Sequence, residues 1–220
     1  MEDILEAKIE KSKKILEEAI QRWKPHIGMA FSFGKDSTTI AHLIRDIYGE
    51  VPIPVLFTDT GVKFKETYEF KDRLVREWGL KVVVAQPLEL YPGTMADDRE
   101  RCCYHHKIEP AQRVMEEQGW KACIVGIRHD EHVARSREHY ISRRENDVYR
   151  VHPILHWSEE DIWQYIHSRN VPYNPLYDKG YRSIGCEPCT VPTPHGAEER
   201  GGRDQDKEVI MERLRGWGYW

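Results

Sequence analysis

The chain has 220 residues, 40% hydrophobic and 32% charged, which is enough to bury a core and excludes a largely disordered chain. Its net charge of −4 excludes an overall field that would attract nucleic acid or an anionic membrane, although a local basic patch is compatible with it. The chain is charged from Glu2 onward and has no apolar run of membrane-spanning length, so we expect a cytoplasmic protein with no membrane contact.

An amphipathic helix is predicted over residues 2–23. Apolar residues recur at helical spacing from Leu5 to Trp23 with charges between them, and Pro25 marks the end of the helix. We expect its apolar stripe to pack against the domain or against another subunit, as in a homodimer.

A strand, a glycine-containing loop and a helix are predicted between residues 27 and 48. The apolar residues before Gly34 predict a strand, and the residues after the loop have helical character. A phosphate would suit this junction, because glycine lets the backbone approach an anion and the first N–H groups of a helix favour negative charge. Lys35 adds an ammonium group, and Ser32 and Ser37 add hydroxyl donors. The alternative is an ordinary turn with a solvated lysine.

A second buried strand over residues 51–58 ends in Asp59, Thr60 and Gly61. Ligands of doubly wound sheets bind beyond the carboxyl ends of the strands. An acidic residue at that position can accept a hydrogen bond from a ribose hydroxyl or hold a metal ion. The alternative interpretation of these three residues is a simple turn.

The remaining elements alternate between strands and helices, which predicts an α/β fold with a doubly wound parallel sheet and flanking helices. They are a helix over 66–78, a strand over 80–85, a turn-rich stretch over 86–98, a helix over 112–118, a strand over 121–127, a helix over 162–168 that begins at the N-cap Ser158 with Asp161 in the capping box, a turn-rich stretch over 171–190 and a helix over 204–214. We divide the chain into an N-terminal helix (1–24), a nucleotide-binding domain (25–157) and a C-terminal helical, cysteine-bearing extension (158–220).

A basic run follows the fourth strand. Gly126 and Arg128 lie at the end of that strand, and Arg135 and Arg137 come shortly after it. We expect these arginines, with Lys107, to contact an anionic substrate at the ligand side of the sheet. A solvated run of charges is the alternative.

The cysteines form two close groups, Cys102 with Cys103 and Cys186 with Cys189. Four thiolates suit an iron–sulfur cluster or zinc, and adjacent cysteines favour the cluster because neighbouring side chains rarely converge on one ion. The fifth cysteine, Cys123, lies within a predicted strand and is expected to be a buried apolar residue. An odd number of cysteines argues against a disulfide framework.

Residues 27–202 resemble the phosphoadenylyl-sulfate reductase and ATP sulfurylase small-subunit family of PP-loop proteins. Residues 32–37 resemble the Ser-Gly-Gly-Lys-Asp-Ser loop of the PP-loop ATP pyrophosphatases, with Phe33 in place of the first glycine. Residues 102–110 and 180–190 resemble the segments that bind a [4Fe-4S] cluster in adenylyl-sulfate reductases. The resemblance implies an adenine nucleotide alpha-hydrolase-like (PP-loop) fold and a [4Fe-4S] cluster on Cys102, Cys103, Cys186 and Cys189.

Two features of the sequence bear on the reaction. The reductases attack sulfate sulfur with a cysteine in a Glu-Cys-Gly-Leu-His tail, whereas no cysteine follows Cys189 in this sequence. The Gly-Lys-Asp-Ser loop is intact, and Lys35 with Mg²⁺ could stabilise a leaving pyrophosphate. We therefore expect an ATP pyrophosphatase that cleaves ATP between its α and β phosphates to adenylylate an acceptor. In this combination of features the chain is closest in character to the ATP pyrophosphatase component of DNA phosphorothioation systems.

This expectation assigns roles to individual residues and implies partners. The catalytic residues would be Lys35, Asp36 and Arg128, and the nucleotide would contact Ser32, Phe33, Gly34, Lys35, Asp36, Ser37, Asp59, Thr60, Gly61, Gly126 and Arg128. Lys107, Arg135 and Arg137 would hold the anionic acceptor or adenylyl sulfate. The implied partners are a sulfur donor such as a cysteine desulfurase and DNA contacted through other proteins.

Two alternatives remain open at this point. One is a reductase of adenylyl sulfate or phosphoadenylyl sulfate that uses an external thiol. The other is a non-catalytic nucleotide-binding subunit that docks through its terminal helices and the aromatic residues Trp217, Tyr219 and Trp220.

Overall fold

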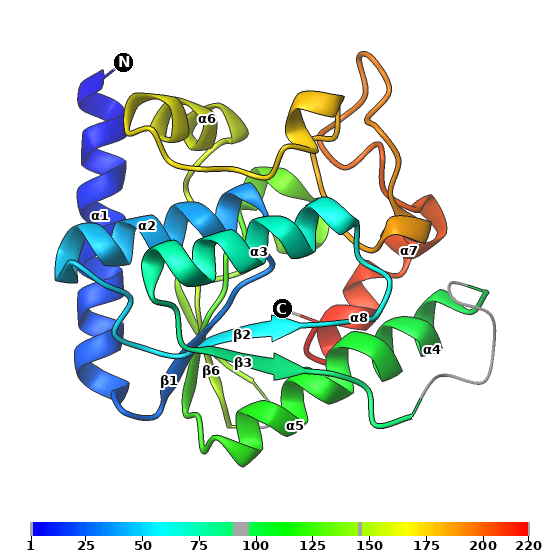
Figure 1. Ribbon diagram of the computed structural model, residues 1–220, viewed down its shortest axis with the longest axis horizontal. Helices are drawn as coiled ribbons and strands as arrows, with labels where there is room; N and C mark the ends of the chain where they lie inside the picture. Colours follow the sequence, from blue (N-terminus) through cyan, green and yellow to red (C-terminus); the bar gives the residue numbers. More distant parts are fainter. Residues whose placement is uncertain (1, 90–96, 145–146, 220) are drawn as a thin grey trace.

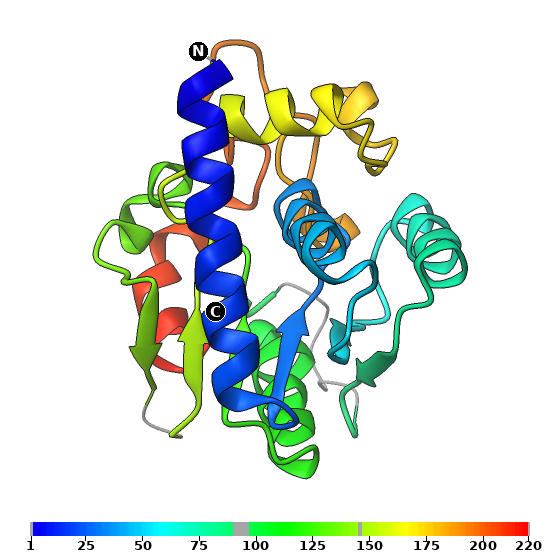
Figure 2. The ribbon, with the colours of Figure 1, turned by 90° about the vertical axis from the view of Figure 1, so that its left-hand side faces the viewer.

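The computed structural model of the chain describes residues 2–89, 97–144 and 147–219. It contains a six-stranded sheet with helices on both faces (Figures 1 and 2). The strand order is β3-β2-β1-β4-β6-β5, and all neighbouring strands are parallel except β5 and β6. The predicted doubly wound α/β sheet is therefore confirmed, with an antiparallel edge that was not predicted.

The elements have the following bounds. The strands are β1 (Ile27–Ala30), β2 (Val55–Thr58), β3 (Val82–Ala85), β4 (Ala122–Ile124), β5 (Ile141–Arg143) and β6 (Tyr149–Val151). The α-helices are α1 (Glu2–Trp23), α2 (Lys35–Tyr48), α3 (Lys65–Trp78), α4 (Arg99–Cys103), α5 (Glu109–Glu117), α6 (Glu159–Ser168), α7 (Gln205–Val209) and α8 (Met211–Gly216). A π-helix, η1 (Tyr104–Ile108), joins α4 to α5, and short 3-10 turns cover 129–131, 133–135, 177–179 and 187–189.

Two layers of helices enclose the sheet. Apolar side chains of α1, α2, α3 and α6 share the larger core with the strands; Leu16, Ile40, Phe70 and Ile162 are among them. On the other face, α5 packs against β2 and β3, and α8 contributes to a smaller core beside it. In Figure 2, α1 runs down the near side of the sheet, with α5 and α8 beyond it. None of the helices in 2–89, 97–144 or 147–219 has the length and hydropathy required to cross a bilayer.

Local signals in the sequence placed most elements correctly. The first helix is confirmed, and Ser158 and Asp161 form the predicted capping box at the start of α6. Strands β5 and β6 were missed because each has only three residues and mixes polar with apolar side chains. The predicted terminal helix is interrupted at Ile210, which separates α7 from α8. Of the predicted turn-rich stretch 86–98, residues 90–96 lie outside the described part, as does Trp220.

The order of the strands creates a crevice at one edge of the sheet. The chain passes from β1 outward to β2 and β3 and then returns to β4 on the other side of β1. Because β1 leads to β2 on one side and β4 leads to β5 and β6 on the other, the carboxyl ends of β1 and β4 border a topological switch point. This is the edge at which a ligand is expected.

Candidate functional site

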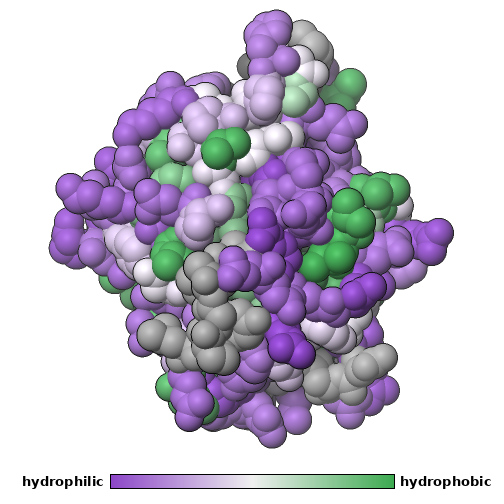
Figure 3. Space-filling view, turned by 90° about the vertical axis from the view of Figure 1, so that its right-hand side faces the viewer, coloured by the Kyte–Doolittle hydropathy of each residue, from purple (hydrophilic) through white to green (hydrophobic). Residues whose placement is uncertain are grey.

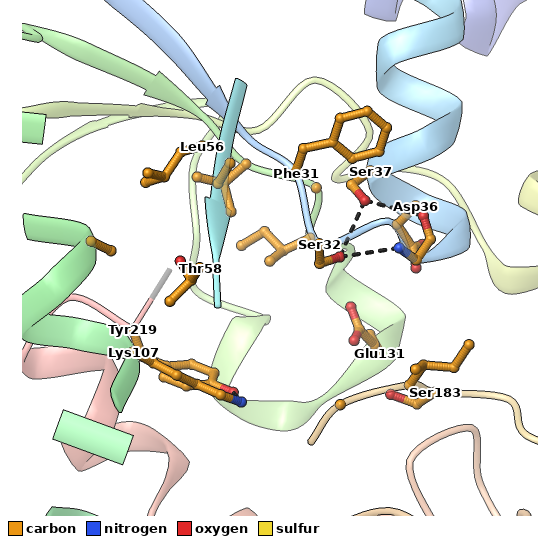
Figure 4. A pocket seen from close by; sticks show the side chains of 18 of the residues that line it. Phe31, Ser32, Asp36, Ser37, Leu56, Thr58, Lys107, Glu131, Ser183 and Tyr219 are labelled. Carbon is orange, nitrogen blue, oxygen red and sulfur yellow. Dashed lines mark hydrogen bonds between the residues drawn. The ribbon is translucent and has the colours of Figure 1, made fainter. Parts of the chain in front are cut away.

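A pocket opens at the carboxyl edge of β1, β2 and β4 (Figure 4). One wall is the loop between β1 and α2, and the opposite wall comes from η1, α5 and the C-terminal residues. Figure 4 shows Lys107 and Tyr219 side by side, across the pocket from Ser32 and Ser37. The predicted site residues that line the pocket are Ser32, Gly34, Lys35, Asp36, Ser37, Lys107, Gly126 and Arg135.

The loop is held in place by its own residues and by a tyrosine from a distant segment. The hydroxyl of Ser32 lies 3.2 Å from that of Ser37 and accepts a hydrogen bond from the Gly34 N–H. The Lys35 N–H, at the start of α2, donates to the Tyr177 hydroxyl at 2.8 Å. The helix therefore begins inside the predicted phosphate loop, four residues earlier than its helical character indicated.

Phe33 occupies a backbone conformation that favours glycine. Its φ is 60°, in the left-handed region, which costs a residue with a Cβ roughly 1–2 kcal/mol. The side chain points into the core, where it stacks on Phe31 at 4.1 Å and meets Phe57 and Phe70 edge-on. This aromatic packing offsets the backbone strain, so Phe33 shapes the loop from behind and does not line the pocket.

Gly126 allows β4 to approach the loop closely. A Cβ built on it would lie 3.2 Å from the Ser37 nitrogen, 3.3 Å from the Asp36 carbonyl carbon and 3.2 Å from Ile40. Two of these neighbours are backbone atoms that cannot turn aside. Any larger residue would push the end of β4 away from the start of α2.

A buried ion-pair network ties the loop to the segment that follows the cysteines. The Lys35 ammonium donates to Glu199 at 2.6 Å and to the Arg182 carbonyl at 2.7 Å. Arg128, which is fully buried, donates to Asp36 at 2.6 Å and to both oxygens of Glu199 at 2.7 and 2.6 Å. The two cations that were expected to hold phosphate are thus already neutralised by carboxylates of this chain.

The network also fixes the ionisation of its members. Burial alone would raise the pKa of Asp36, but Arg128 and Lys35 outweigh it and lower that pKa to about 2. Burial would lower the pKa of Lys35, yet Asp36, Tyr177 and Glu199 raise it above its ordinary value. Lys35 and Asp36 therefore remain charged at neutral pH.

The pocket as a whole carries more positive than negative charge. Its lining contains seven cations, Lys35, Lys63, Lys107, Arg135, Arg150, Arg200 and Arg203, and two carboxylates, Asp36 and Glu131. Sequence reasoning did not select Lys63, Arg150, Arg200 or Arg203. The Arg-Gly-Gly-Arg stretch at residues 200–203 could have indicated Arg200 and Arg203.

Several predicted ligand residues lie elsewhere. Asp59 accepts hydrogen bonds from the Gly61 N–H at 2.9 Å, the Tyr68 hydroxyl at 2.6 Å and Gln86 at 3.1 Å, so it stabilises its own turn. The Thr60 hydroxyl lies 3.3 Å from the sulfur of Cys186. Arg137 is exposed. None of Asp59, Thr60, Gly61, Arg128 and Arg137 lines the pocket.

The four grouped cysteines line a second, smaller cavity. Cys102, Cys103, Cys186 and Cys189 surround it together with His106, Lys107, Pro188 and Lys207. Lys107 lines both cavities, so the two sites share a wall. In the part of the chain that the structure describes, no three His, Cys, Asp or Glu side chains gather closely enough to hold a single metal ion.

The backbone around this cavity brings the two pairs of cysteines together. The π-helix η1 directly follows Cys103, and the wider turn of such a helix is frequent at functional sites. On the other side, the Glu187 N–H donates to the Val62 carbonyl at 2.8 Å and holds Cys186 against the turn after β2. The segments 99–108 and 186–189 therefore meet beside the pocket.

Lysines surround the cysteine cavity without carboxylate partners among the described residues. Lys207 is buried and donates to the Tyr219 hydroxyl at 2.5 Å, and Lys107 lies 3.5 Å from that hydroxyl. Burial would raise the pKa of Cys186, but Lys107 and Lys63 lower it to about 6, so this cysteine is a thiolate at neutral pH. Figure 3 views the molecule from the side on which α4 and α7 lie in Figure 1, and this face is predominantly hydrophilic with a few apolar groups.

Comparisons with known proteins identify relatives. The family described as the phosphoadenosine phosphosulfate reductase domain matches residues 26–192. Adenosine 5'-phosphosulfate reductase of Staphylococcus epidermidis is 34% identical over 200 residues, which cover 86% of this chain and 81% of the relative. Adenosine 5'-phosphosulfate reductase 2 of Bacillus subtilis is 33% identical over 204 residues, covering 88% and 85%. Phosphoadenylyl-sulfate reductase from Candida auris, solved as a phosphate complex, has the same fold, with a TM-score of 0.72 at 23% identity over 82% of this chain and 90% of that one.

These comparisons confirm the expected PP-loop fold and correct the expected activity. The interpretation as an ATP pyrophosphatase is wrong, because the curated relatives are reductases. The expectation rested on Lys35 as a cation available to a leaving pyrophosphate, and the structure gives a physical reason for the error: Glu199 and the Arg182 carbonyl bind its ammonium group. The match over most of its length shows that the chain belongs to the phosphoadenosine phosphosulfate reductase family.

Proposed function

We propose that the protein is an adenylyl-sulfate reductase that uses an external thiol. A thiolate attacks the sulfate sulfur, the bond from that sulfur to the bridging oxygen breaks, and AMP leaves with the electron pair. A second thiolate then attacks the thiol sulfur of the S-sulfo adduct, which forms a disulfide and releases sulfite. Two thiols are oxidised by two electrons in total, and the sulfate sulfur is reduced by two.

The excess of cations in the pocket is the observation that carries this proposal. Among the seven lining cations, Lys63, Lys107, Arg150 and Arg203 have no ion pair with a carboxylate in the described part of the chain. Arg203 instead donates to the Ser183 hydroxyl at 3.1 Å. A phosphosulfate group carries two negative charges and would supply the missing counter-charge.

Adenylyl sulfate would bind with its anionic end between the loop and the shared wall of the two cavities. The N-terminal N–H groups of α2 and the hydroxyls of Ser32 and Ser37 would bind the phosphate oxygens. Lys107 and Arg203 would bind the sulfate and stabilise the charge that develops on the departing AMP. ATP and Mg²⁺ have no part in this reaction.

An external thiol fits the environments of the five cysteines. Four of them line the second cavity. Burial raises the pKa of Cys123, which lies mid-strand in β4 and is the fifth, so it remains a thiol. The nucleophile would therefore approach from the open side of the pocket.

We propose that the second cavity holds a [4Fe-4S] cluster on Cys102, Cys103, Cys186 and Cys189. The donor set fits this group, because four soft ligands face one cavity and do not converge on the position of one ion. Lys63, Lys107 and Lys207 balance the negative charge of the thiolates. A bound cluster would supply a fixed charge beside Lys107 and would tie residues 186–189 to 102–103.

Sulfite release tests the activity directly. Purified protein is incubated without oxygen with adenylyl sulfate and a dithiol, and sulfite and AMP are measured together. We expect equal amounts of both products, and more product from adenylyl sulfate than from ATP. Nucleotide binding without sulfite, with either a small dithiol or a dithiol protein as reductant, would refute the proposal.

A matched pair of variants locates the reaction in this pocket. Arg203→Met should reduce kcat/KM for sulfite formation by about tenfold or more, because it removes a charge-assisted contact to the substrate. Arg143→Met is the control, since Arg143 is exposed on β5 and its ion pair is with the exposed Asp147. Equal activity in the two variants would place the substrate elsewhere.

Iron analysis tests the cluster independently of activity. Protein purified without oxygen should show visible absorption with about four iron and four acid-labile sulfide per chain. Cys103→Ser should lose that absorption, whereas Cys123→Ser should retain it, because Cys123 lies outside the second cavity. Tightly bound zinc in place of iron would contradict the proposal.

A further inference from the structure

Arg150 is a buried arginine that lacks a hydrogen-bond or ion-pair partner among the residues that the structure describes. It lies on β6 and is 2% exposed. Other buried arginines have acceptors: Arg128 is bound by Glu199 and Asp36, Arg200 by Glu208, and Arg203 by the Ser183 hydroxyl. Arg150 forms no side-chain hydrogen bond or ion pair with any residue in 2–89, 97–144 or 147–219, and its buried Nη1 lacks an acceptor.

The carboxylate whose charge acts on Arg150 is already bound by other arginines. Glu138 acts on Arg150 only from beyond ion-pair distance, and its carboxylate accepts hydrogen bonds from Arg144 and Arg215. Burial correspondingly lowers the pKa of the Arg150 guanidinium. A buried charge without a partner is destabilising, so a residue of this kind indicates a group that is missing from the free protein.

The guanidinium borders the inner end of the pocket. Arg150 lies beside Cys123 in the sheet register, and both line the pocket on the face that α5 covers. The other walls of this inner chamber are apolar and come from Ala30, Leu56 and Met115. Figure 4 shows Leu56 set back from the loop, on the far side of Thr58 from Lys107.

The two ends of the pocket therefore differ in chemistry. The outer end presents the loop and several cations, and the inner end presents apolar walls and one guanidinium. A ligand that fills both ends needs an anionic group at one end and, at the other, a flat apolar group that carries a hydrogen-bond acceptor. The phosphosulfate and the adenine of adenylyl sulfate have these properties, since the purine ring has apolar faces and acceptor nitrogens at its edge.

We propose that Arg150 is a base-recognition residue that donates a hydrogen bond to a ring nitrogen of adenine. The proposal rests on the proposed function only in that the ligand is an adenine nucleotide. Binding would give the guanidinium an acceptor that no described residue provides. The same residue then destabilises the empty protein and stabilises the complex.

These opposite effects on the stability of the empty protein and on ligand binding distinguish a base-recognition residue from a structural one. Arg150→Met keeps most of the side-chain volume and removes the buried charge. We expect the melting temperature of the ligand-free variant to equal or exceed that of the original protein, while its affinity for AMP falls about ten- to hundredfold. A structural arginine would instead lower the melting temperature when removed.

Titration calorimetry with three probes identifies the part of the nucleotide that Arg150 contacts. AMP and adenosine should both bind the Arg150→Met variant more weakly by the same factor, and ribose 5-phosphate should bind both proteins equally. Arg143→Met is the control and should bind all three as the original protein does. An equal loss for ribose 5-phosphate and AMP would assign Arg150 to the phosphate and overturn the proposal, as would unchanged AMP affinity.

Two further measurements keep the test decisive. If Arg150→Met does not fold, Arg150→Lys retains the charge but not the second donor nitrogen, and it should still weaken AMP binding while leaving ribose 5-phosphate binding unchanged. Unchanged AMP binding in that variant overturns the proposal. Failure of sulfite formation with an intact Arg150 effect on AMP would refute the reaction alone. Sulfite formation with an unchanged KM in Arg150→Met would refute this inference alone.

Discussion

The phosphate loop and the cysteine cavity lie on opposite sides of one pocket and differ in how their charges are neutralised. At the loop, the buried cations Lys35 and Arg128 are bound by Asp36 and Glu199, so the network is complete without a ligand. At the cysteine cavity, Lys107 and Lys207 have no carboxylate within ion-pair distance among the described residues, and their nearest counter-charges are thiols and Tyr219.

This difference distinguishes charges that stabilise the fold from charges that bind a ligand. Charges that the protein itself neutralises hold the loop in shape, and their removal should cost stability. Charges that lack an internal partner are available to a ligand or to a thiolate-bound cluster, and their removal should cost binding. Four predictions test this distinction.

The largest effect is expected from the loop network. Glu199→Ala leaves Lys35 and Arg128 buried without their shared carboxylate and should lower the free energy of unfolding by about 3–5 kcal/mol. Denaturant titration of the variant measures this loss. Glu198→Ala is the matched control, because Glu198 is the exposed neighbour. A loss below about 1 kcal/mol would mean that the network does not stabilise the fold.

Acid should destabilise the protein without disturbing the loop. Burial lowers the pKa of His152 to about 3. The His152 imidazole therefore takes up a proton near pH 6.5 in the unfolded chain but stays neutral there in the folded chain. The contribution of neutral His152 to the free energy of unfolding is complete above pH 6.5. It is lost as the pH falls toward 3, by about 3 kcal/mol between pH 6.5 and 4. Asp36, with a pKa of about 2, stays ionised over that range.

Denaturant titrations at several pH values check the sign and the source of this effect. The free energy of unfolding should rise from pH 4 to pH 6.5, and His152→Gln should flatten the rise. A profile that is equally steep in the variant would assign the acid sensitivity to other groups, such as His156, whose pKa burial lowers to about 4.

Close packing behind the loop gives a smaller effect. Gly126→Ala adds a Cβ at 3.2 Å from the backbone nitrogen of Ser37 and should cost about 1–2 kcal/mol in stability and weaken AMP binding. Gly216→Ala is the control, because nothing lies within 4 Å of its added Cβ. Thermal melting and AMP titration measure both quantities; an unchanged AMP affinity would show that β4 can shift without moving the loop.

The smallest change in stability is expected beside the cysteines. Lys207→Met removes a buried cation whose hydrogen bond goes to Tyr219, so the free energy of unfolding should change by about 1 kcal/mol or less. Iron content measured in the same preparation should fall, because the thiolates lose a counter-charge. Lys65→Met on the exposed surface of α3 is the control. A large loss of stability with full iron content would reverse the distinction between the two regions.

The sequence predicted those features that depend on local patterns. Helix α1, the capping box at Ser158 and the loop around Gly34 all have signals within a few residues. The grouping of the cysteine pairs in one cavity followed from a family resemblance, not from spacing alone. Local patterns and family motifs therefore indicated where the two cavities lie.

The pairing of charges could not be predicted in this way. Lys35 is bound by Glu199, which is 164 positions away, and no local pattern connects them. Arg150 alternates with apolar neighbours in β6, as an exposed strand residue would, and only the fold shows that it is buried. Tyr219, which one alternative assigned to an interface, lines the pocket with Lys107. Which cations are neutralised is a property of the tertiary structure.

The π-helix η1 connects α4 to α5 without a break, so residues 99–117 form one continuous helical segment. Deleting one residue from the regular turns of α5 would rotate everything before the deletion by about 100° around the helix axis. Cys102 and Cys103 would then turn away from residues 186–189, although no cysteine had been changed. The spacing of this segment is as much a part of the site as its thiols, so single-residue insertions and deletions should be tolerated far less well within residues 109–117 than beyond Glu117.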